Sequence, residues 1–385
     1  MYHKKVKALV LLSGGLDSIL AVKILQSQNI KVTGVCFVSN FFGSEKAEIA
    51  AKNLNIELKI IDISKEMIEI VRNPKNGHGK NLNPCIDCHG FMFKTAWQKL
   101  NSTSLQKSNF IINFIKSIFI FLSLPMASGK CGKILSRKNA EDLFNKKSKY
   151  DFIATGEVLG QRPFSQNKTA LRRVEKIAGI EILRPLSAKL LPETSIERKK
   201  IVQRDKLFDI QGRTRIGQTK LIKKYKIKDY PSPAGGCLLT DPSFSQRLAA
   251  MLEKWPECTP GDIEFLKHGR VFWLNYNYQS KLNSVLIIIG RHNADNKILK
   301  KIKQENDLMI ELKNIPGPVT IVRNLNISLD DKKFNNLSIP SEMNLDKINF
   351  TDYKNKKDIL NTIFILTGYY SPKARGKKVD FVVKG

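Results

Sequence analysis

A glycine turn close to the N-terminus is the feature that most constrains this sequence. Residues 13–18 read SGGLDS and follow the apolar run Ala8–Leu12, whose lack of alternation predicts a strand buried on both faces. Glycines let backbone N–H groups approach an anion closely, and the helix expected next adds the positive end of its dipole. The turn therefore predicts a phosphate site. It has neither the lysine of the Walker P-loop nor the spacing of the dinucleotide fingerprint.

Strand-like and helix-like segments alternate after this turn. Strands are expected at Lys31–Val38 and Glu57–Ile63, with a helix over Ser44–Leu54 between them, and a further strand at Asp151–Thr155. Such alternation predicts an α/β fold with a doubly wound parallel sheet. Ligands of these sheets bind at the carboxyl ends of the strands, where the glycine turn lies.

In this setting SGGLDS resembles the PP-loop of the N-type ATP pyrophosphatases, which cleave ATP between its α and β phosphates and transfer AMP. The resemblance implies that Asp17 positions Mg²⁺ and that adenine rests near Phe37, toward the end of the second strand. The plainer alternative is a turn that only caps the helix through Ser13 or Asp17. The residues expected to bind the nucleotide are Ser13, Gly14, Gly15, Asp17, Ser18, Phe37 and Gly156.

Two further motifs narrow the resemblance. Residues 154–166 read ATGEVLGQRPFSQ and residues 182–186 read ILRPL; both resemble stretches of tRNA 4-thiouridine synthase. The A-T-G also occupies the place of A-T-G-H in the tRNA 2-thiouridine synthases. The resemblance covers roughly residues 5 to 100 and 150 to 245. It implies an ATP-dependent tRNA sulfurtransferase that adenylates a uridine carbonyl and replaces its oxygen with sulfur, giving 4-thiouridine or 2-thiouridine.

The cysteines supply the candidate sulfur chemistry. Six cysteines in 385 residues are too few for a disulfide framework and indicate a reducing compartment. Cys85 and Cys88 form a C-x-x-C at an expected helix start, where the helix dipole would stabilise thiolates. Cys237 follows a turn rich in Pro and Gly. In the thiouridine synthases a cysteine in a comparable turn faces the earlier motif, so the resemblance implies that the three cysteines meet.

Two routes of sulfur delivery fit these cysteines. In the persulfide route Cys237 carries the sulfur and Cys88 resolves the disulfide; the donor is then a persulfide carrier such as a cysteine desulfurase, and Cys85 is left unused. Three cysteines also resemble the cluster-bearing thiolases, in which three thiolates hold a [4Fe–4S] cluster whose open iron binds sulfide. The spacing favours the cluster. A zinc site that includes His89, and two ordinary buried thiols, remain as alternatives.

Charge and the last third of the chain predict an RNA partner. Lys and Arg number 65 against 35 Asp and Glu, a net charge of +30 that favours a polyanion such as tRNA. Three islands, at residues 291–296, 314–318 and 369–378, resemble the NFACT-R domain, an RNA-binding module. Tyr369 and Tyr370 would stack on unpaired bases, although a solvated basic tail is the alternative. Phosphate contacts are expected from Arg291, Lys373, Arg375, Lys377 and Lys378.

These motifs predict two domains. A PP-loop thiolation domain is expected at residues 1–245, with an atypical insertion at about 101–149, and a smaller α+β, NFACT-R-like domain at residues 268–385. The apolar part of the insertion, residues 110–127, is short and interrupted for a bilayer span. No signal-peptide pattern is visible. We therefore expect a cytoplasmic protein with no membrane partner.

Two other functions compete with RNA thiolation. One is a PP-loop enzyme of the deazaguanine type that adenylates a small-molecule carboxylate or amide; the RNA-binding module argues against it. The other is a non-catalytic protein that binds tRNA or the ribosome. The intact SGGLDS motif and the three placed cysteines argue against that reading.

Overall fold

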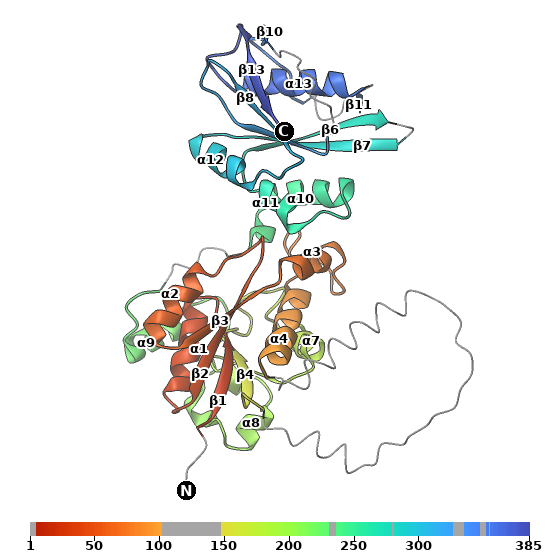
Figure 1. The fold of residues 1–385 in the computed structure, drawn as a ribbon. Coiled ribbons are helices and arrows are strands. Elements are labelled where there is room, and N and C mark those ends of the chain that lie inside the picture. The colour runs from red at the N-terminus through yellow and green to blue at the C-terminus, as the bar shows by residue number, and fades with distance from the viewer. Residues whose placement is uncertain are drawn as a thin grey trace, which may run out of the picture. The chain divides into compact units, whose positions relative to one another are not determined.

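The computed structural model describes residues 5–101, 148–230, 236–278, 281–325, 335–346, 352–353 and 355–385. The expected insertion falls almost wholly outside this set, as does most of the turn before Cys237. The chain forms two compact units, Met1–Cys237 (unit 1) and Leu238–Gly385 (unit 2) (Figure 1).

Unit 1 is built on a five-stranded parallel sheet, which confirms the predicted α/β class. Its strands are β1 (Lys7–Leu11), β2 (Lys31–Val38), β3 (Glu57–Asp62), β4 (Phe152–Thr155) and β5 (Ile182–Leu183). They lie in the order β3-β2-β1-β4-β5, and every pairing is parallel. Ala8, Leu9 and Val10 of β1 are fully buried, as expected of a central strand that helices cover on both faces.

Helices pack on both faces of this sheet. The longer ones are α1 (Leu16–Gln26), α2 (Glu45–Leu54), α3 (Ser64–Arg72), α4 (Cys85–Asn101), α7 (Lys168–Ala178) and α9 (Ile216–Tyr225); α8 (Ser195–Arg198) and the 3-10 turns η1 (Ala188–Leu190) and η2 (Arg204–Lys206) are short. Helices α1, α2 and α9 form one layer, and α3, α4 and α7 form the other (Figure 1). The sheet is therefore doubly wound, as the alternating pattern predicts.

The strand order creates a switch point between β1 and β4. From β1 the chain moves to β2 on one side of the sheet, and it returns later to β4 on the other side. Open α/β sheets bind ligands at the carboxyl ends of the strands at such a point. The glycine turn follows β1 and Gly156 follows β4. Both predicted nucleotide segments therefore leave the sheet at the position where this topology binds ligands.

Unit 2 is a smaller α+β unit. Helix α13 packs its apolar side, including Ile359, Ile363 and Phe364, on a six-stranded sheet in the order β11-β6-β7-β9-β8-β13, with β10 and β12 paired apart. Its elements are η3 (Leu238–Thr240), α10 (Pro242–Lys254), α11 (Pro260–Phe265), β6 (Arg270–Tyr278), β7 (Lys281–Ile289), α12 (Asn293–Ile302), β8 (Leu308–Leu312), β9 (Thr320–Arg323), β10 (Leu337–Ser338), β11 (Asp352–Tyr353), α13 (Lys356–Tyr369), β12 (Lys378–Val379) and β13 (Phe381–Lys384). Among the described residues of both units, no helix is long and apolar enough to cross a membrane.

Candidate active site

The glycine turn passes directly from β1 into α1. Gly14 has a φ of +74°, and a Cβ at this position would lie 2.2 Å from the backbone carbonyl of Lys46 in α2, so only glycine fits. The Ser18 hydroxyl donates to the Gly15 carbonyl at 2.7 Å, and the Gly15 N–H donates to Ser13 Oγ at 3.3 Å. Within the described chain no side chain caps the start of α1. Its first N–H groups are therefore available to an anion.

Two glutamine side chains hold Asp17, the residue expected to position Mg²⁺. Gln161 Nε2 donates to Asp17 Oδ2 at 2.9 Å, and Gln218 Nε2 donates to Asp17 Oδ1 at 3.1 Å. Gln161 comes from the loop after β4, whereas Gln218 belongs to α9 and is fully buried. Both carboxylate oxygens thus accept a hydrogen bond from a glutamine side chain, which orients the carboxylate.

Gly156 joins β4 to the same place. A Cβ at Gly156 would lie 2.4 Å from the Asp17 carbonyl and from Ser18 N, so the loop after β4 packs directly on the first turn of α1. Phe37 is buried near the end of β2, the neighbour of β1. The nucleotide residues predicted from the sequence therefore leave the sheet along one edge. That Phe37 contacts adenine stays a prediction.

A buried ion-pair network continues from Gly156. Glu157 is 5% exposed; its Oε1 lies 2.8 Å from His89 Nδ1, and its Oε2 accepts from Arg184 Nε at 3.1 Å. Burial alone would raise the Glu157 pKa, but the Arg184 charge and the His89 hydrogen bond outweigh it and lower that pKa to about 2. An ionised carboxylate only accepts hydrogen bonds. His89 Nδ1 is therefore the donor of the hydrogen bond to Glu157.

The pKa of the Cys88 thiol depends on its burial and on charge at the other two cysteines of the site. Cys88 lies one helical turn after Cys85, at the start of α4, and is 7% exposed. Burial raises the Cys88 pKa well above its usual range, and negative charge on Cys237 or Cys85 would raise it further. Burial therefore opposes the thiolate that the helix dipole was expected to stabilise at Cys88, and that expectation stays a prediction.

Cys85 differs from Cys88 in its polar surroundings. Burial raises the Cys85 pKa, while the nearby Arg162 charge and hydrogen bonds with Ser165 and Asn83 oppose this shift. The Cys85 thiol donates to Asn83 Oδ1 at 3.0 Å. Cys85 thus has hydrogen-bond partners of its own.

The three cysteines do not form a metal-holding group in this geometry. Across the ranges that the structure describes, no three or more His, Cys, Asp or Glu side chains are arranged to hold a metal ion. Cys85 bonds Asn83, and His89 bonds Glu157. The [4Fe–4S] cluster that the spacing favours and the zinc alternative with His89 therefore stay predictions.

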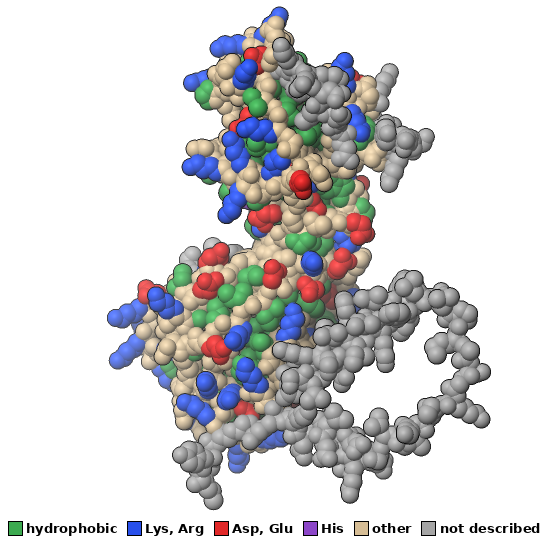
Figure 2. All heavy atoms as spheres, viewed as in Figure 1, with side chains coloured by type: hydrophobic (Ala, Val, Ile, Leu, Met, Phe, Trp, Pro, Cys, Tyr) green, Lys and Arg blue, Asp and Glu red, His purple; other side chains and the backbone are tan. Residues whose placement is uncertain are grey.

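The expected RNA-binding residues lie in unit 2. Lys373, Lys377 and Lys378 are exposed where the chain passes from α13 to β12. Arg375 lies over the Tyr369 ring, 4.4 Å from its centroid, and donates to the Tyr369 carbonyl at 2.7 Å. Figure 2 shows further lysine and arginine side chains gathered on the α12 side of this unit.

Arginines cover part of the aromatic surface that was expected to stack on bases. Arg270 lies over the Tyr370 ring, 4.3 Å from its centroid, and the rings of Tyr369 and Tyr370 meet edge to face at 5.8 Å. Arg291 is held by the buried carboxylate of Asp295, with Nε donating to Oδ2 at 2.7 Å. The Arg291 charge is therefore partly neutralised within the protein, and Arg270 joins the basic set as a residue that the sequence did not single out.

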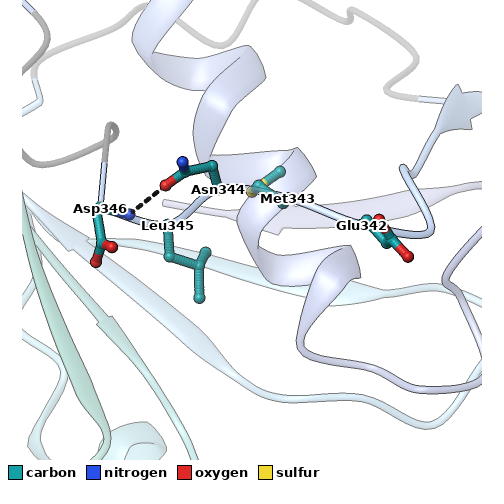
Figure 3. Close-up of a pocket in the computed structure, with 5 residues that line it drawn as sticks. All are labelled: Glu342, Met343, Asn344, Leu345 and Asp346. Atoms are coloured by element: carbon teal, nitrogen blue, oxygen red, sulfur yellow. Dashed lines mark hydrogen bonds between the residues drawn. The ribbon is translucent and has the colours of Figure 1, made fainter.

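A hollow of about 660 Å³ lies elsewhere in unit 2 (Figure 3). Residues 342–346 line it, and the Asp346 N–H donates to Asn344 Oδ1 at 3.1 Å. Met343 and Leu345 from this segment also pack on the core of the unit. No residue predicted to bind nucleotide, sulfur or RNA lines the hollow, and we assign it no role.

Four residues of the site were not assigned roles from the sequence. Glu157, Gln161 and Arg184 lie in motifs that the sequence displays, but spacing alone does not reveal their partners. Gln218 lies in a lysine-rich helical segment with no motif around it. Only the packing of α9 against α1 brings Gln218 to Asp17.

Sequence comparison supports the expected resemblance. No model of a protein family matches the chain. The chain is 34% identical over 101 residues to the tRNA-specific 2-thiouridylase MnmA of Syntrophomonas wolfei subsp. wolfei; the match covers 23% of this chain and 29% of the relative. The resemblance to tRNA thiouridine synthases is thereby confirmed. The chain spans about three tenths of the length of this relative.

Solved structures give weaker likenesses. A 4-thiouridine synthetase–RNA complex with bound ATP is 19% identical, with a TM-score of 0.30, over 67% of this chain and 53% of that one. A predicted subunit of tRNA methyltransferase from Methanocaldococcus jannaschii is 17% identical, with a TM-score of 0.28, over 47% and 69%. The C-terminal part of the fibronectin/fibrinogen-binding protein from Streptococcus suis is 14% identical, with a TM-score of 0.18, over 50% and 70%. These likenesses are too weak to bear on function.

Replacing Glu157 with Gln removes the buried carboxylate partner of Arg184 and leaves it paired with Glu175, which is partly exposed. We expect the free energy of unfolding to fall by about 3 kcal/mol near neutral pH, because a pKa lowered from 4.5 to about 2 corresponds to about 1.4 kcal/mol per unit. The folded Glu157 pKa of about 2 lies below the ordinary value of 4.5, so its stabilisation is present above pH 4.5 and is lost as the pH falls toward 2. The two proteins should therefore converge in stability over that range, as measured by urea unfolding.

The matched control is Glu181→Gln, which removes a carboxylate from an exposed pair with Arg198. This variant should change stability little at any pH. A Glu157→Gln effect that stays constant down to the lowest pH would contradict the ion-pair account.

Proposed function

We propose that this chain is an ATP-dependent tRNA sulfurtransferase that adenylates a uridine carbonyl and then replaces the oxygen with sulfur. One observation carries the proposal: the start of α1 and the cysteine helix α4 are joined in unit 1. Gly156 packs on the Asp17 backbone, Glu157 follows it and bonds His89, and His89 is adjacent to Cys88. Similarity to a 2-thiouridylase supports the same chemistry.

The first step is activation of the base. A carbonyl oxygen is a poor leaving group, so it first attacks the α-phosphate of ATP, and pyrophosphate departs. The N–H groups of the glycine turn and of the α1 start offset charge on the phosphates. Asp17, oriented by Gln161 and Gln218, has the oxygen ligands that Mg²⁺ prefers. When bound, Mg²⁺ would neutralise phosphate charge during this step.

The second step uses the thiols. A persulfide-carrying protein places a sulfane sulfur on Cys237, and this sulfur attacks the activated carbon, so that the C–O bond breaks and AMP leaves. The Cys88 thiolate then attacks Cys237 Sγ, which leaves the sulfane sulfur on the base and forms a Cys88–Cys237 disulfide. A cellular dithiol reduces that disulfide for the next cycle.

A buried thiol with a raised pKa needs a base before it can act as the resolving nucleophile. His89 follows Cys88 in α4, and its Nδ1 donates to Glu157. We assign no base to Cys88, because neighbouring positions of a helix do not face each other.

The RNA would be held by the basic residues of unit 2. Lys373, Lys377 and Lys378 are exposed and have no carboxylate partner in the described ion pairs, whereas Arg291 is paired with Asp295. The three lysines are therefore proposed as the main phosphate contacts. Arg375 contributes a charge that its stacking on Tyr369 keeps in place.

The proposal is tested with purified protein, ATP, unmodified tRNA and either a persulfide carrier or free sulfide. With the carrier, the wild type should form thiouridine, detected by mass spectrometry of tRNA nucleosides. Cys88→Ala and Cys237→Ala should lose at least about 10³-fold in rate, because each removes a reacting sulfur. Cys85→Ala should keep most of the activity and serves as the matched control from the same helix.

Three results would contradict parts of this account. No thiouridine with either donor would remove the sulfurtransferase function and favour a small-molecule substrate or a non-catalytic role. A brown, anaerobically purified protein that uses free sulfide and loses colour in Cys85→Ala would restore the [4Fe–4S] route. Full activity in Cys88→Ala would exclude the resolving thiol.

Changing Lys373, Lys377 and Lys378 together to Gln tests the RNA surface. Each lost phosphate contact lowers the magnitude of the slope of log affinity against log salt by about 0.7 to 0.9, so the loss of three should lower it by about 2 to 3. Filter binding of tRNA over a salt series measures it. The control changes Lys52, Lys65 and Lys199, exposed lysines of unit 1, to Gln. Equal slopes in the two triple variants would point to net charge alone.

A further inference from the structure

We infer that Phe164 and Arg162 form a platform that binds an unpaired base of the RNA substrate beside Cys85, at the start of the helix that carries Cys88. Phe164 is 70% exposed, more than any other large apolar side chain in the described ranges. Single exposed apolar residues are common on protein surfaces, so exposure alone decides nothing. The inference depends on where Phe164 lies and on what holds it there, and it rests on the proposed function.

The loop that carries Phe164 is closed by its own backbone. The Gly160 N–H donates to the Gln166 carbonyl at 2.7 Å, and the Gln166 N–H donates to the Arg162 carbonyl at 2.8 Å. Gln166 is buried, while Arg162 and Phe164 face solvent. The tip is therefore exposed but anchored. A loop whose backbone is held in this way loses little conformational entropy when a ligand binds at its tip.

This loop contacts both halves of the candidate active site. Gln161 donates to Asp17 Oδ2 at 2.9 Å, on the nucleotide side. On the sulfur side the loop supplies Ser165, which bonds Cys85, and Arg162, whose charge acts on Cys85 against the effect of burial. A ligand on the tip is thus next to segments that hold ATP and sulfur in the proposed reaction.

The cysteine loop approaches Phe164 from the other direction. A Cβ built on Gly79 would lie 3.8 Å from the Phe164 Cβ. The Gly79 N–H donates to the Asn83 carbonyl at 2.8 Å, and the Asn83 side chain accepts from the Cys85 thiol at 3.0 Å. The Phe164 loop thus lies against the turn at Gly79. The Gly79–Asn83 and Asn83–Cys85 hydrogen bonds connect that turn to Cys85.

The chemistry of this tip fits an unpaired nucleotide. A uridine within a duplex has both ring faces stacked and its carbonyl edge covered, so an enzyme that acts on that carbonyl needs the base out of the stack. An exposed aromatic ring replaces the lost stacking without regard to sequence. Arg162 adds a positive charge two residues away, suited to a phosphate of the same strand. The net charge of +30 points the same way.

The test compares two RNA hairpins that differ only in whether one uridine is unpaired or paired. Wild-type protein should bind the hairpin with the unpaired uridine more tightly, as measured by fluorescence anisotropy. Phe164→Ala should weaken that binding by about 5- to 150-fold, the range for loss of one base–aromatic stack, and should remove the preference. Phe164→Tyr should keep both, and Arg162→Ala should lower the salt slope by about 1.

The matched control is Ile49→Ala, which removes an apolar side chain of α2 that is 62% exposed. It should leave binding unchanged. Unchanged binding and preference in Phe164→Ala would overturn the inference. So would a defect confined to reactions with the persulfide carrier, because that result would make the tip a protein-docking site. The wild type could also bind RNA in a way that depends on Phe164 and yet form no thiouridine. That result would support the platform and would contradict only the proposed reaction.

Discussion

The arrangement of the site in unit 1 depends on the buried ion pair and hydrogen bond that Glu157 makes with Arg184 and His89. Glu157 ties three segments that are far apart in sequence: the loop after β4, the start of α4 through His89, and the strand end at Arg184. A lone carboxylate in this position would be costly, and the Arg184 charge offsets that cost. Because Gly156 packs on the first turn of α1, the same network fixes the cysteine helix relative to the glycine turn.

The geometry changes the view of sulfur delivery that the spacing suggests. A C-x-x-C with a third distant cysteine resembles a cluster site, yet Cys85 bonds Asn83 and interacts with Arg162 and Ser165. Cys88 is a buried thiol whose pKa would be raised further by negative charge on either Cys237 or Cys85. Cys85 has polar hydrogen-bond partners of its own, so Cys88 and Cys237 are the pair that we propose for the persulfide and its resolving thiol. In this account Cys85 carries no transferred sulfur and instead contacts the loop that presents Phe164, through Ser165 and Arg162.

Much of the fold follows from local patterns, whereas the site depends on long-range packing. Apolar runs at β1 and β2 and the intervening helix define the parallel sheet, and Gly14 marks a turn that only glycine fits. The two glutamine hydrogen bonds to Asp17 were not predictable from the sequence. Gln218 lies 201 positions after Asp17 in the chain and has no motif around it. The burial that raises the Cys88 pKa was missed for a similar reason, because burial is set by the packing of the whole unit.

The central claim is that ATP activates a uridine oxygen that sulfur then replaces. Transfer RNA labelled with oxygen-18 at both uridine carbonyls tests it most directly, with AMP and the thiouridine analysed by mass spectrometry after reaction with the persulfide carrier. The account predicts that AMP acquires one labelled oxygen and that the thiouridine keeps the other. AMP, pyrophosphate and thiouridine should form in equal amounts. Unlabelled AMP, or ADP and phosphate as products, would contradict it.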